Sequence, residues 1–351
     1  MEGHITISTI AKAVGVSGAT VHRALYGKPG VSPAVATEIR RLAAELGYQP
    51  GKQSATTRGK PVCLVAAFPE AEGSNRFFYS QLWEGANSCL DELKAYHLDI
   101  HRVSYSDTPG RQFPETLRRI LRDTRGDIDG IITGGRIFKE GFAMLHRLQE
   151  GGVPVVLVSE DDPQGTYLFC AQSDGQVDGQ LAAELLVSQT RPGEAVLMCA
   201  GDVLLHSNRS CMLGFEQYLN QSPSSRRLIK IHGDPEQDGV RDELRRVLAN
   251  DPSVRALYSV NLRCSLVMAQ VVEELGLSGK VRLVGSDLCA ESALYMKRGT
   301  MTAILFRNPR HQGWLGAKRL TDWLLHRMPP PGSMEYVRSS IILKSNLEQY
   351  L

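Results

Sequence analysis

Small hydroxyl and basic side chains gather in one short stretch near the amino terminus. Ser17, Thr20 and Arg23 follow one another at three-residue spacing, which places them along one face of a helix. An arginine can bond guanine O6 and N7 together, because its planar fork matches both acceptors. Hydroxyls bind phosphates, which sets the register of a protein on DNA without reading sequence. The stretch therefore predicts a DNA contact in which Arg23 carries the base readout.

Three short helices are predicted to position this stretch. Apolar residues recur at helical spacing over 7–14, and Gly15 ends that helix. Ser17 then caps a second helix that continues to Gly27. A third helix follows Ser32, which is its cap. Two short helices joined by a tight turn, with a third in support, form a helix-turn-helix module.

Specific residues of this module match a known pattern. They are Ala11, Gly15-Val16-Ser17, Thr20-Val21, Arg23, Leu25, Gly27, Val31-Ser32 and Leu46-Gly47-Tyr48-x-Pro50. At these positions the chain resembles the headpiece of the LacI/GalR family of transcription regulators. The resemblance implies that the second helix lies in the major groove, with Gly18, Ala19 and Arg23 toward the base edges. It implies phosphate contacts at Thr6, Ser17, Thr20, Tyr26 and Ser32. For His22 three alternatives stay open: a phosphate contact, a base contact or solvation.

The segment 51–61 departs from the family pattern. The family usually carries a short hinge helix here, whose leucine wedges into the minor groove and kinks the DNA. This chain has no leucine in the segment, Thr57 stands near the leucine position, and the glycines and threonines favour a helix poorly. We therefore expect a linker without a leucine wedge, in which Lys52, Arg58 and Lys60 still bind phosphates, with a minor-groove arm as the alternative.

Charge is unevenly distributed along the 351 residues. Residues 1–60 hold eight Lys or Arg against three acids, whereas the rest holds thirty-two bases against thirty-five acids. A basic head on a slightly acidic body suits a polyanion partner at one end. The amino terminus lacks the apolar core of a signal peptide, and no apolar run approaches the roughly 18 residues of a membrane span. We expect a cytoplasmic protein with no membrane partner.

Residue types that carry catalysis or bind metals show no clear pattern. The seven cysteines form no Cys-x-x-Cys pair, which favours their being small core residues. The histidines, among them His97, His101, His206 and His232, are scattered and are expected to be solvated or part of a core. The chain has no Gly-x-x-x-x-Gly-Lys phosphate loop and no Gly-x-Ser-x-Gly elbow. We expect no enzyme activity, no metal and no cofactor.

From residue 62 onward, short apolar runs alternate with longer amphipathic segments. Strands are expected at 62–68, 100–104, 130–133, 153–159, 195–200, 228–232, 256–260, 281–285 and 301–306. Helices are expected between them, such as 78–96, 177–188, 212–220, 240–248, 266–275 and 312–325. This alternation predicts an α/β body of doubly wound parallel sheets, and a body of about 285 residues favours two lobes.

Several motifs in the body also match a known fold. They include Asn75-Arg76-Phe77-Phe78, Asp129-Gly130-Ile131-Ile132, Val153-Pro154-Val155-Val156, Arg209-x-x-x-x-Gly214-Phe215 and Val284-Gly285-Ser286-Asp287. They resemble the type I periplasmic-binding-protein fold, which is the sensor of the same family. The resemblance implies two lobes joined by crossovers near 159–164, 286–291 and 306–311. The expected organisation is a helical headpiece over 1–50, a linker over 51–61, an N-terminal lobe over 62–161 plus 289–308, and a C-terminal lobe over 162–288 plus 309–351.

Ligands of this fold bind between the lobes, at the carboxyl ends of the strands. The resemblance implies that Phe77 and Phe78 stack on a sugar ring, although core packing is their alternative. It implies hydroxyl contacts from Asn75, Ser159, Arg209 and Asp287, and Asn261 is expected to bind the effector as well.

The charge expected in the cleft departs from that of many sugar sensors. Leu262 stands where they place an aspartate, and Arg307 stands where family members carry Asp or Gln. The arginines expected to converge on the cleft are Arg76, Arg136, Arg209, Arg263 and Arg307. A cluster of guanidinium groups suits a phosphate or carboxylate. We therefore expect a sugar phosphate or sugar acid as effector, with a neutral sugar or polyol as the alternative.

These features favour a transcription regulator, most simply a repressor, controlled by a sugar-like effector. One headpiece reads few base pairs, so a homodimer on a palindromic DNA operator is expected. A stand-alone binding protein for uptake and an enzyme are the competing hypotheses. The basic headpiece argues against the first of these, and the lack of catalytic motifs argues against the second.

Overall fold

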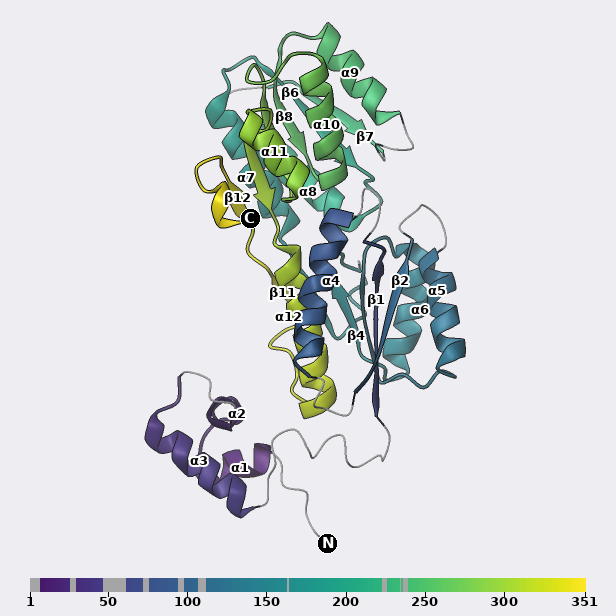
Figure 1. Ribbon diagram of the computed structural model, residues 1–351, viewed down its shortest axis with the longest axis vertical. Helices are drawn as coiled ribbons and strands as arrows, with labels where there is room; N and C mark the ends of the chain where they lie inside the picture. The colour runs from purple at the N-terminus through teal and green to yellow at the C-terminus, as the bar shows by residue number, and fades with distance from the viewer. Residues whose placement is uncertain are drawn as a thin grey trace.

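The structure, a computed structural model, describes residues 7–25, 30–46, 61–71, 76–93, 98–106, 112–162, 164–222, 226–233, 235 and 239–351. Its amino-terminal part contains α1 (Ile7–Val14), α2 (Gly18–Leu25) and α3 (Pro33–Glu45) (Figure 1). The apolar faces of these helices meet in one small core, formed by Ile10, Ala11, Val21, Ala24, Ile39 and Ala43. The predicted three-helix module is therefore confirmed.

Short-range contacts fix α2 within this module. Gly15 has a φ of 73°, a left-handed conformation that favours glycine and ends α1. The Ser17 hydroxyl accepts from the Thr20 N–H at 3.2 Å, as an N-cap does. At the other end, Arg40 Nε of α3 donates to the Ala24 carbonyl at 2.9 Å. Both ends of α2 are thus tied down, which sets the direction of its outer face.

The first lobe, called the N-lobe below, is built on a six-stranded sheet in the order β11-β5-β4-β3-β1-β2. Its strands are β1 (Val62–Pro69), β2 (Leu98–Tyr105), β3 (Gly130–Gly134), β4 (Val155–Val158), β5 (Phe169–Gln172) and β11 (Met334–Tyr336), and all their pairings are parallel. One face packs against α4 (Arg76–Asp91) and α12 (Pro309–His326). The other face packs against α5 (Gln112–Asp123) and α6 (Phe138–Glu150). The sheet is therefore doubly wound, as predicted.

The second lobe, the C-lobe, has a sheet of the same design, in the order β12-β10-β9-β8-β6-β7. Its strands are β6 (Ala195–Gly201), β7 (Leu228–His232), β8 (Val254–Ser259), β9 (Arg282–Ser286), β10 (Ala303–Phe306) and β12 (Ser340–Ile342). Only β12 pairs antiparallel. One face packs against α7 (Gly175–Gln189) and α8 (His206–Gln221), and the other against α9 (Val240–Asn250), α10 (Leu262–Glu274) and α11 (Ala290–Arg298).

The strand order positions a site in each lobe. In both sheets the second strand in sequence lies on one side of the first and the third lies on the other side. Connections that leave in opposite directions open a crevice at the carboxyl ends of the two central strands. The crevices of β1/β3 and of β6/β8 are thus the places where a ligand between the lobes is expected.

The chain passes between the lobes after β5, after β10 and after β11 (Figure 1). The expected lobe boundaries are therefore wrong, apart from the crossover near 306–311. Residues 164–172 and 309–336 belong to the N-lobe, whereas 289–306 belong to the C-lobe. The expected linker over 51–61 lies, except for Pro61, outside the described residues.

Close helix packing holds α12 in the N-lobe despite its late place in the sequence. A Cβ added at Gly85 of α4 would lie 1.8 Å from the Arg310 carbonyl oxygen, and one added at Gly313 of α12 would lie 2.1 Å from that of Leu82. The two backbones thus approach as only glycines permit. This contact depends on residues more than two hundred positions apart, which periodicity within a segment does not reveal.

Candidate functional site

A cavity of about 90 Å³ lies between the two lobes. Its lining comes from the carboxyl ends of β3 and β4 in the N-lobe, of β6, β7 and β8 in the C-lobe, from the first turns of α4, α8 and α10, and from the second crossover. The lining residues are Phe78, Tyr79, Gly135, Arg136, Ser159, Glu160, Asp202, Leu205, Ser207, Asn208, Gly233, Pro235, Asn261, Leu262, Arg263 and Arg307. This is the location that the strand order predicts for a ligand.

A second, more polar cavity of about 340 Å³ borders the first on the side of the crossovers. The two cavities share Ser159, Ser207 and Arg307. The other residues around the second cavity are Asp161, Gln172, Ser173, Asp174, Gly175, Gln176, His206, Ser210, Cys211 and Tyr336. Asp174 caps α7, because its carboxylate accepts from the N–H groups of Gln176 and Val177. Arg307 thus stands between two spaces that both lie between the lobes.

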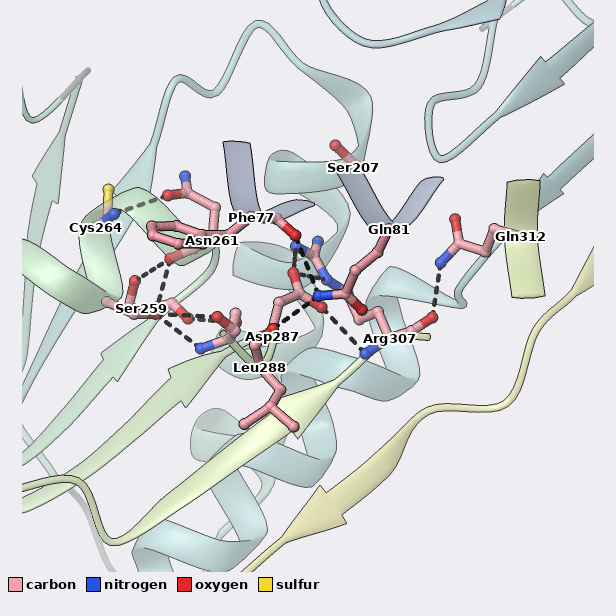
Figure 2. Close-up of polar contacts among 12 residues, drawn as sticks. Phe77, Gln81, Ser207, Ser259, Asn261, Cys264, Asp287, Leu288, Arg307 and Gln312 are labelled. Atoms are coloured by element: carbon pink, nitrogen blue, oxygen red, sulfur yellow. Dashed lines mark hydrogen bonds and ion pairs between the residues drawn. The ribbon is translucent and has the colours of Figure 1, made fainter. Parts of the chain in front are cut away.

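Arg307 is held by a buried carboxylate. Its Nε donates to Asp287 Oδ2 at 3.0 Å, its Nη2 donates to the same oxygen, and its backbone N–H donates to Asp287 Oδ1 at 3.2 Å (Figure 2). Gln312 Nε2 donates to the Arg307 carbonyl at 2.7 Å. Burial alone would lower the pKa of Arg307, but the charge and hydrogen bonds of Asp287 raise it. The guanidinium therefore stays charged and fixed, with its Cζ 5.4 Å from the centre of the Phe78 ring.

A second ion pair crosses the cleft. Arg136, which follows β3 of the N-lobe, donates through Nη2 to Asp202 Oδ2, which follows β6 of the C-lobe. The Arg136 side chain is only 4% exposed and that of Asp202 is 19% exposed. A pair so well shielded from water is expensive to break, because one buried charge would be left without its counterion.

Glu160 makes a further contact between the lobes. It follows β4 of the N-lobe, and its carboxylate accepts from the His206 N–H at 2.6 Å and from the Ser207 hydroxyl at 2.7 Å. These groups begin α8 of the C-lobe, where Leu205 provides no side-chain cap. Glu160 therefore supplies the missing N-cap from the other lobe. Burial raises the pKa of Glu160 to about 7, although the hydrogen bonds from Ser207 and His206 work in the opposite direction.

Neutral hydrogen bonds also reach the cleft. Gln81 Nε2 of α4 donates to the Leu288 carbonyl of the C-lobe at 2.8 Å and to the Phe77 carbonyl at 3.1 Å (Figure 2). Asn261 Oδ1 accepts from the Cys264 N–H at 3.0 Å and so caps α10. The oxygen of Asn261 is therefore engaged in capping, which leaves its amide nitrogen as the group that can serve a ligand.

Three residues around the cleft hold a left-handed backbone without being glycine. Ser159 has a φ of 63°, Asp287 of 61° and Asn308 of 53°. Such conformations cost of order 1 kcal/mol or more and persist where surrounding contacts enforce them. All three directly follow strands or lie in a crossover, so the strain is concentrated at the ends of the elements that shape the cleft.

Most of the described residues expected to bind an effector reach the cavity. Phe78, Arg136, Ser159, Asn261, Arg263 and Arg307 line it. Asp287 is fully buried behind Arg307 and acts through it. Phe77 is half-buried and lines neither cavity. Asn75 lies outside the described residues, as does the side chain of Arg76.

The prediction that Arg209 faces the cleft is wrong for this structure. Arg209 is exposed and lines neither cavity. Its neighbours Ser207 and Asn208 turn inward on the first turn of α8, and successive helix residues are about 100° apart, so Arg209 points away.

Sequence reasoning missed the acidic half of the site. Glu160, Asp202, Ser207 and Asn208 line the cavity, yet none belongs to a recognisable motif. The available signal was their place at strand ends: Glu160 comes two residues after β4, and Asp202 directly follows β6. Polar residues at the carboxyl ends of parallel strands line the crevices in which ligands bind.

The outer side of α2 presents the residues expected to contact DNA. Ser17, Ala19 and Arg23 are exposed, whereas Gly18, Thr20 and His22 are half-buried. Ser32 is exposed and caps α3. Thr6, Tyr26, Lys52 and Arg58 lie outside the described residues. The exposed face carries no acidic side chain in α2, so it suits a polyanion.

A helix-turn-helix head followed by two α/β lobes with a cavity between them defines a class of protein: a small-molecule sensor that carries its own DNA-binding module. The sequence profile described as "Bacterial regulatory proteins, lacI family" matches residues 6–51, and that of "Periplasmic binding protein domain" matches residues 73–325. The chain belongs to the LacI family, with a periplasmic binding protein domain as its sensor. It is a DNA-binding transcriptional regulator.

Individual relatives agree with this assignment. The HTH-type transcriptional regulator DegA of Bacillus subtilis (strain 168) is 22% identical over 285 residues, which cover 80% of this chain and 81% of DegA. The D-allose-binding periplasmic protein of Escherichia coli (strain K12) is 35% identical over 81 residues, covering 23% and 26% of the two chains. Among solved structures, the glucose-galactose binding protein GanP of Geobacillus stearothermophilus aligns with a TM-score of 0.70 at 21% identity, covering 82% of this chain and 99% of GanP. No helix within the described residues is long and apolar enough to cross a membrane.

Proposed function

We propose that this regulator represses transcription as a homodimer bound to a palindromic operator. The exposed face of α2 carries few base-reading side chains, chiefly Arg23, so one headpiece has little selectivity by itself. Two copies related by a two-fold axis read two half-sites and multiply that selectivity. A dimer seated on an operator blocks access to the promoter. A cytoplasmic location is part of this proposal, since the DNA is there.

The effector is proposed to be a neutral sugar or polyol that binds between the lobes. The observation that carries this is the pairing of cavity arginines with carboxylates: Arg307 with Asp287, and Arg136 with Asp202. Paired in this way, they donate to hydroxyls without leaving an excess of positive charge. Phe78, backed by Arg307, offers a flat surface for a sugar ring. The relative that binds D-allose supports the same class of ligand.

A sugar acid or sugar phosphate is the second candidate. Three arginines line the cavity, Arg136, Arg263 and Arg307, and guanidinium groups bind carboxylates and phosphates through two parallel hydrogen bonds. This candidate requires an anion that displaces the carboxylates already in place. We therefore rank it below the neutral sugar.

Effector binding is proposed to act by changing how the lobes close. A ligand shifts such an equilibrium only by the difference in its affinity for the two states. The contacts of Glu160, Arg136 and Gln81 across the cleft give the closed arrangement a stability of its own. An effector that adds contacts to both lobes stabilises it further, and so changes the geometry presented to DNA.

Calorimetry on matched ligands tests the effector class. A hexose that stabilises the protein in a thermal-shift panel is compared with its 6-phosphate and its uronic acid. The neutral member is expected to bind most tightly, and Phe78→Ala is expected to weaken it, while Leu204→Ala on the exposed surface does not. Tighter binding of either anion would reverse the ranking of the two candidates.

Sedimentation showing a monomer at micromolar concentration would contradict the dimer.

Binding of operator selected from random DNA tests the regulatory role. The selected sites are expected to be palindromic, and their affinity to change when the effector is added. Transcription from a template carrying such a site should fall as the protein is added. Asymmetric sites, or transcription that rises, would refute the corresponding parts of the proposal.

A further inference from the structure

A cysteine, an aspartate and a histidine lie close together near the amino-terminal ends of β1 and β2. These strand ends are on the side of the N-lobe sheet that is opposite the cleft. The parallel register of β1 and β2 places Cys63 beside Asp99, and His101 is two residues further along β2. Side chains alternate along a strand, so all three project from the same face of the sheet. Their Sγ, carboxylate and imidazole ligand atoms lie within 4.8 Å of one another, and His101 Nε2 is 3.1 Å from Asp99 Oδ2.

We propose that Cys63, Asp99 and His101 bind a divalent transition metal ion of the Zn²⁺ class. Zinc takes thiolate, imidazole and carboxylate ligands, and three protein ligands plus a water form an accepted coordination set. Bonds of roughly 2.0–2.3 Å place tetrahedral ligands about 3.5 Å apart. The ligand atoms therefore need to move inward by about 1 Å. Thiolate and imidazole together exclude Mg²⁺ and Ca²⁺, which prefer oxygen.

The exposure of the three side chains allows this inward movement. Cys63 is buried, with 5% of its surface exposed, so its sulfur is a fixed point. The side chains of Asp99 and His101 are 57% and 39% exposed and have room to turn toward an ion. A bound ion takes Cys63 as the thiolate, whose proton goes to solvent, and His101 as the neutral imidazole.

A second carboxylate, that of Asp129 directly before β3, supports the site. Asp129 Oδ2 accepts from the Cys63 N–H at 2.9 Å, and the Asp129 N–H donates to the Cys63 carbonyl at 2.8 Å. These bonds hold the backbone of the proposed sulfur ligand and place another negative charge near a bound cation. The site involves residues at the start of β1, directly after the segment that joins the headpiece to the sensor. A bound ion would fasten β1 to β2 at that point.

Titration of the full-length protein with Co²⁺, followed by competition with Zn²⁺, tests the proposal. Wild-type protein is expected to bind one Co²⁺ at this site and to show the near-ultraviolet thiolate-to-cobalt absorption, which Zn²⁺ then removes. Cys63→Ser should abolish that absorption, and His101→Asn or Asp99→Asn should weaken binding about ten-fold or more. Cys89→Ser alters a buried cysteine of α4, which packs against the other face of the same sheet; it is the matched control and should bind as wild type does.

Thermal melts of every variant establish that it is folded. If Cys63→Ser does not fold, the partly exposed Asp99 and His101 variants decide the matter. The proposal is overturned if wild-type protein shows no thiolate band. It is equally overturned if the band survives in His101→Asn and Asp99→Asn with unchanged affinity. The test uses no sugar and no DNA, so its result is independent of the proposed function.

Discussion

Closure of the sensor is expected to depend on pH through Glu160. Its carboxylate is buried between the lobes and receives hydrogen bonds from His206 and Ser207 of the other lobe. Opening the cleft breaks these bonds and returns the carboxylate to water. The pKa of Glu160 then falls from about 7 toward its ordinary value of 4.5. The closed state therefore holds a proton on Glu160 more tightly than the open state does.

The sign and size of the effect follow from this difference. Below pH 4.5 the group is protonated in both states, and closure carries no penalty from its charge. As pH rises from 4.5 to 7, the open state ionises first, so closure becomes less favourable, and above 7 the loss is complete. At about 1.4 kcal/mol per pH unit, the difference corresponds to about 3 kcal/mol, or roughly two orders of magnitude in the closing equilibrium.

Hydrogen exchange at the start of α8 measures this directly. After correction for intrinsic rates, the His206 amide of the wild type should be up to roughly a hundred-fold better protected at pH 5 than at pH 8. Glu160→Gln keeps an acceptor oxygen without the titration, so its protection should be nearly independent of pH. Glu150→Gln, an exposed residue of the same lobe, is the control and should behave as wild type. An equal pH dependence in Glu160→Gln and wild type would refute the reasoning.

Three further substitutions probe other parts of the molecule. Arg23→Ala should cost about 1–3 kcal/mol per half-site in specific operator binding, while non-specific binding largely survives. A mobility-shift titration at fixed salt would measure both. An unchanged ratio of specific to non-specific affinity would contradict the role of Arg23. Gly179→Ala places a Cβ 2.0 Å from the Cys211 carbonyl oxygen, so separation of α7 and α8 should lower stability by about 1–3 kcal/mol or more, and an unchanged melting temperature would argue against this packing. Asp287→Asn leaves Arg307 buried without its counterion and should lower the free energy of unfolding in urea by about 3–5 kcal/mol. The double variant, which also carries Arg307→Gln, should recover part of that loss. Equal losses in the single and the double variant would show that charge is not the cause.

The headpiece could be predicted because its determinants are local. Gly15, Ser17 and Ser32 mark helix ends through their own backbone chemistry, and the apolar spacing between them reports the core. The strands of the body were found for a similar reason: most are buried on both faces and appear as short apolar runs. Residues that follow these strands, such as Arg136 and Ser159, were correctly expected at the cleft.

The lobe boundaries and the charge balance of the cleft could not be predicted in this way. β5 is four residues long, and α12 joins the N-lobe through close packing against α4 at Gly85 and Gly313, which are far apart in sequence. The partners of the cleft arginines were hidden for the same reason. Asp202 lies sixty-six positions from Arg136 in the sequence, and nothing local to either residue reports their contact.

The carboxylates of Asp202 and Asp287 affect which class of ligand the cleft can accept at the lowest cost in free energy. Arginines alone would favour an anion, and the residue types at 262 and 307 pointed that way. Asp202 and Asp287 already hold the places that the oxygens of a phosphate or acid would take beside Arg136 and Arg307. An anion that displaced them would leave buried carboxylates without counterions, which is costly. A hydroxyl group can donate to a carboxylate and accept from a guanidinium at once. A polyhydroxylated ring over Phe78 could therefore bond to the Arg136–Asp202 pair without breaking it, which is why the neutral sugar ranks first.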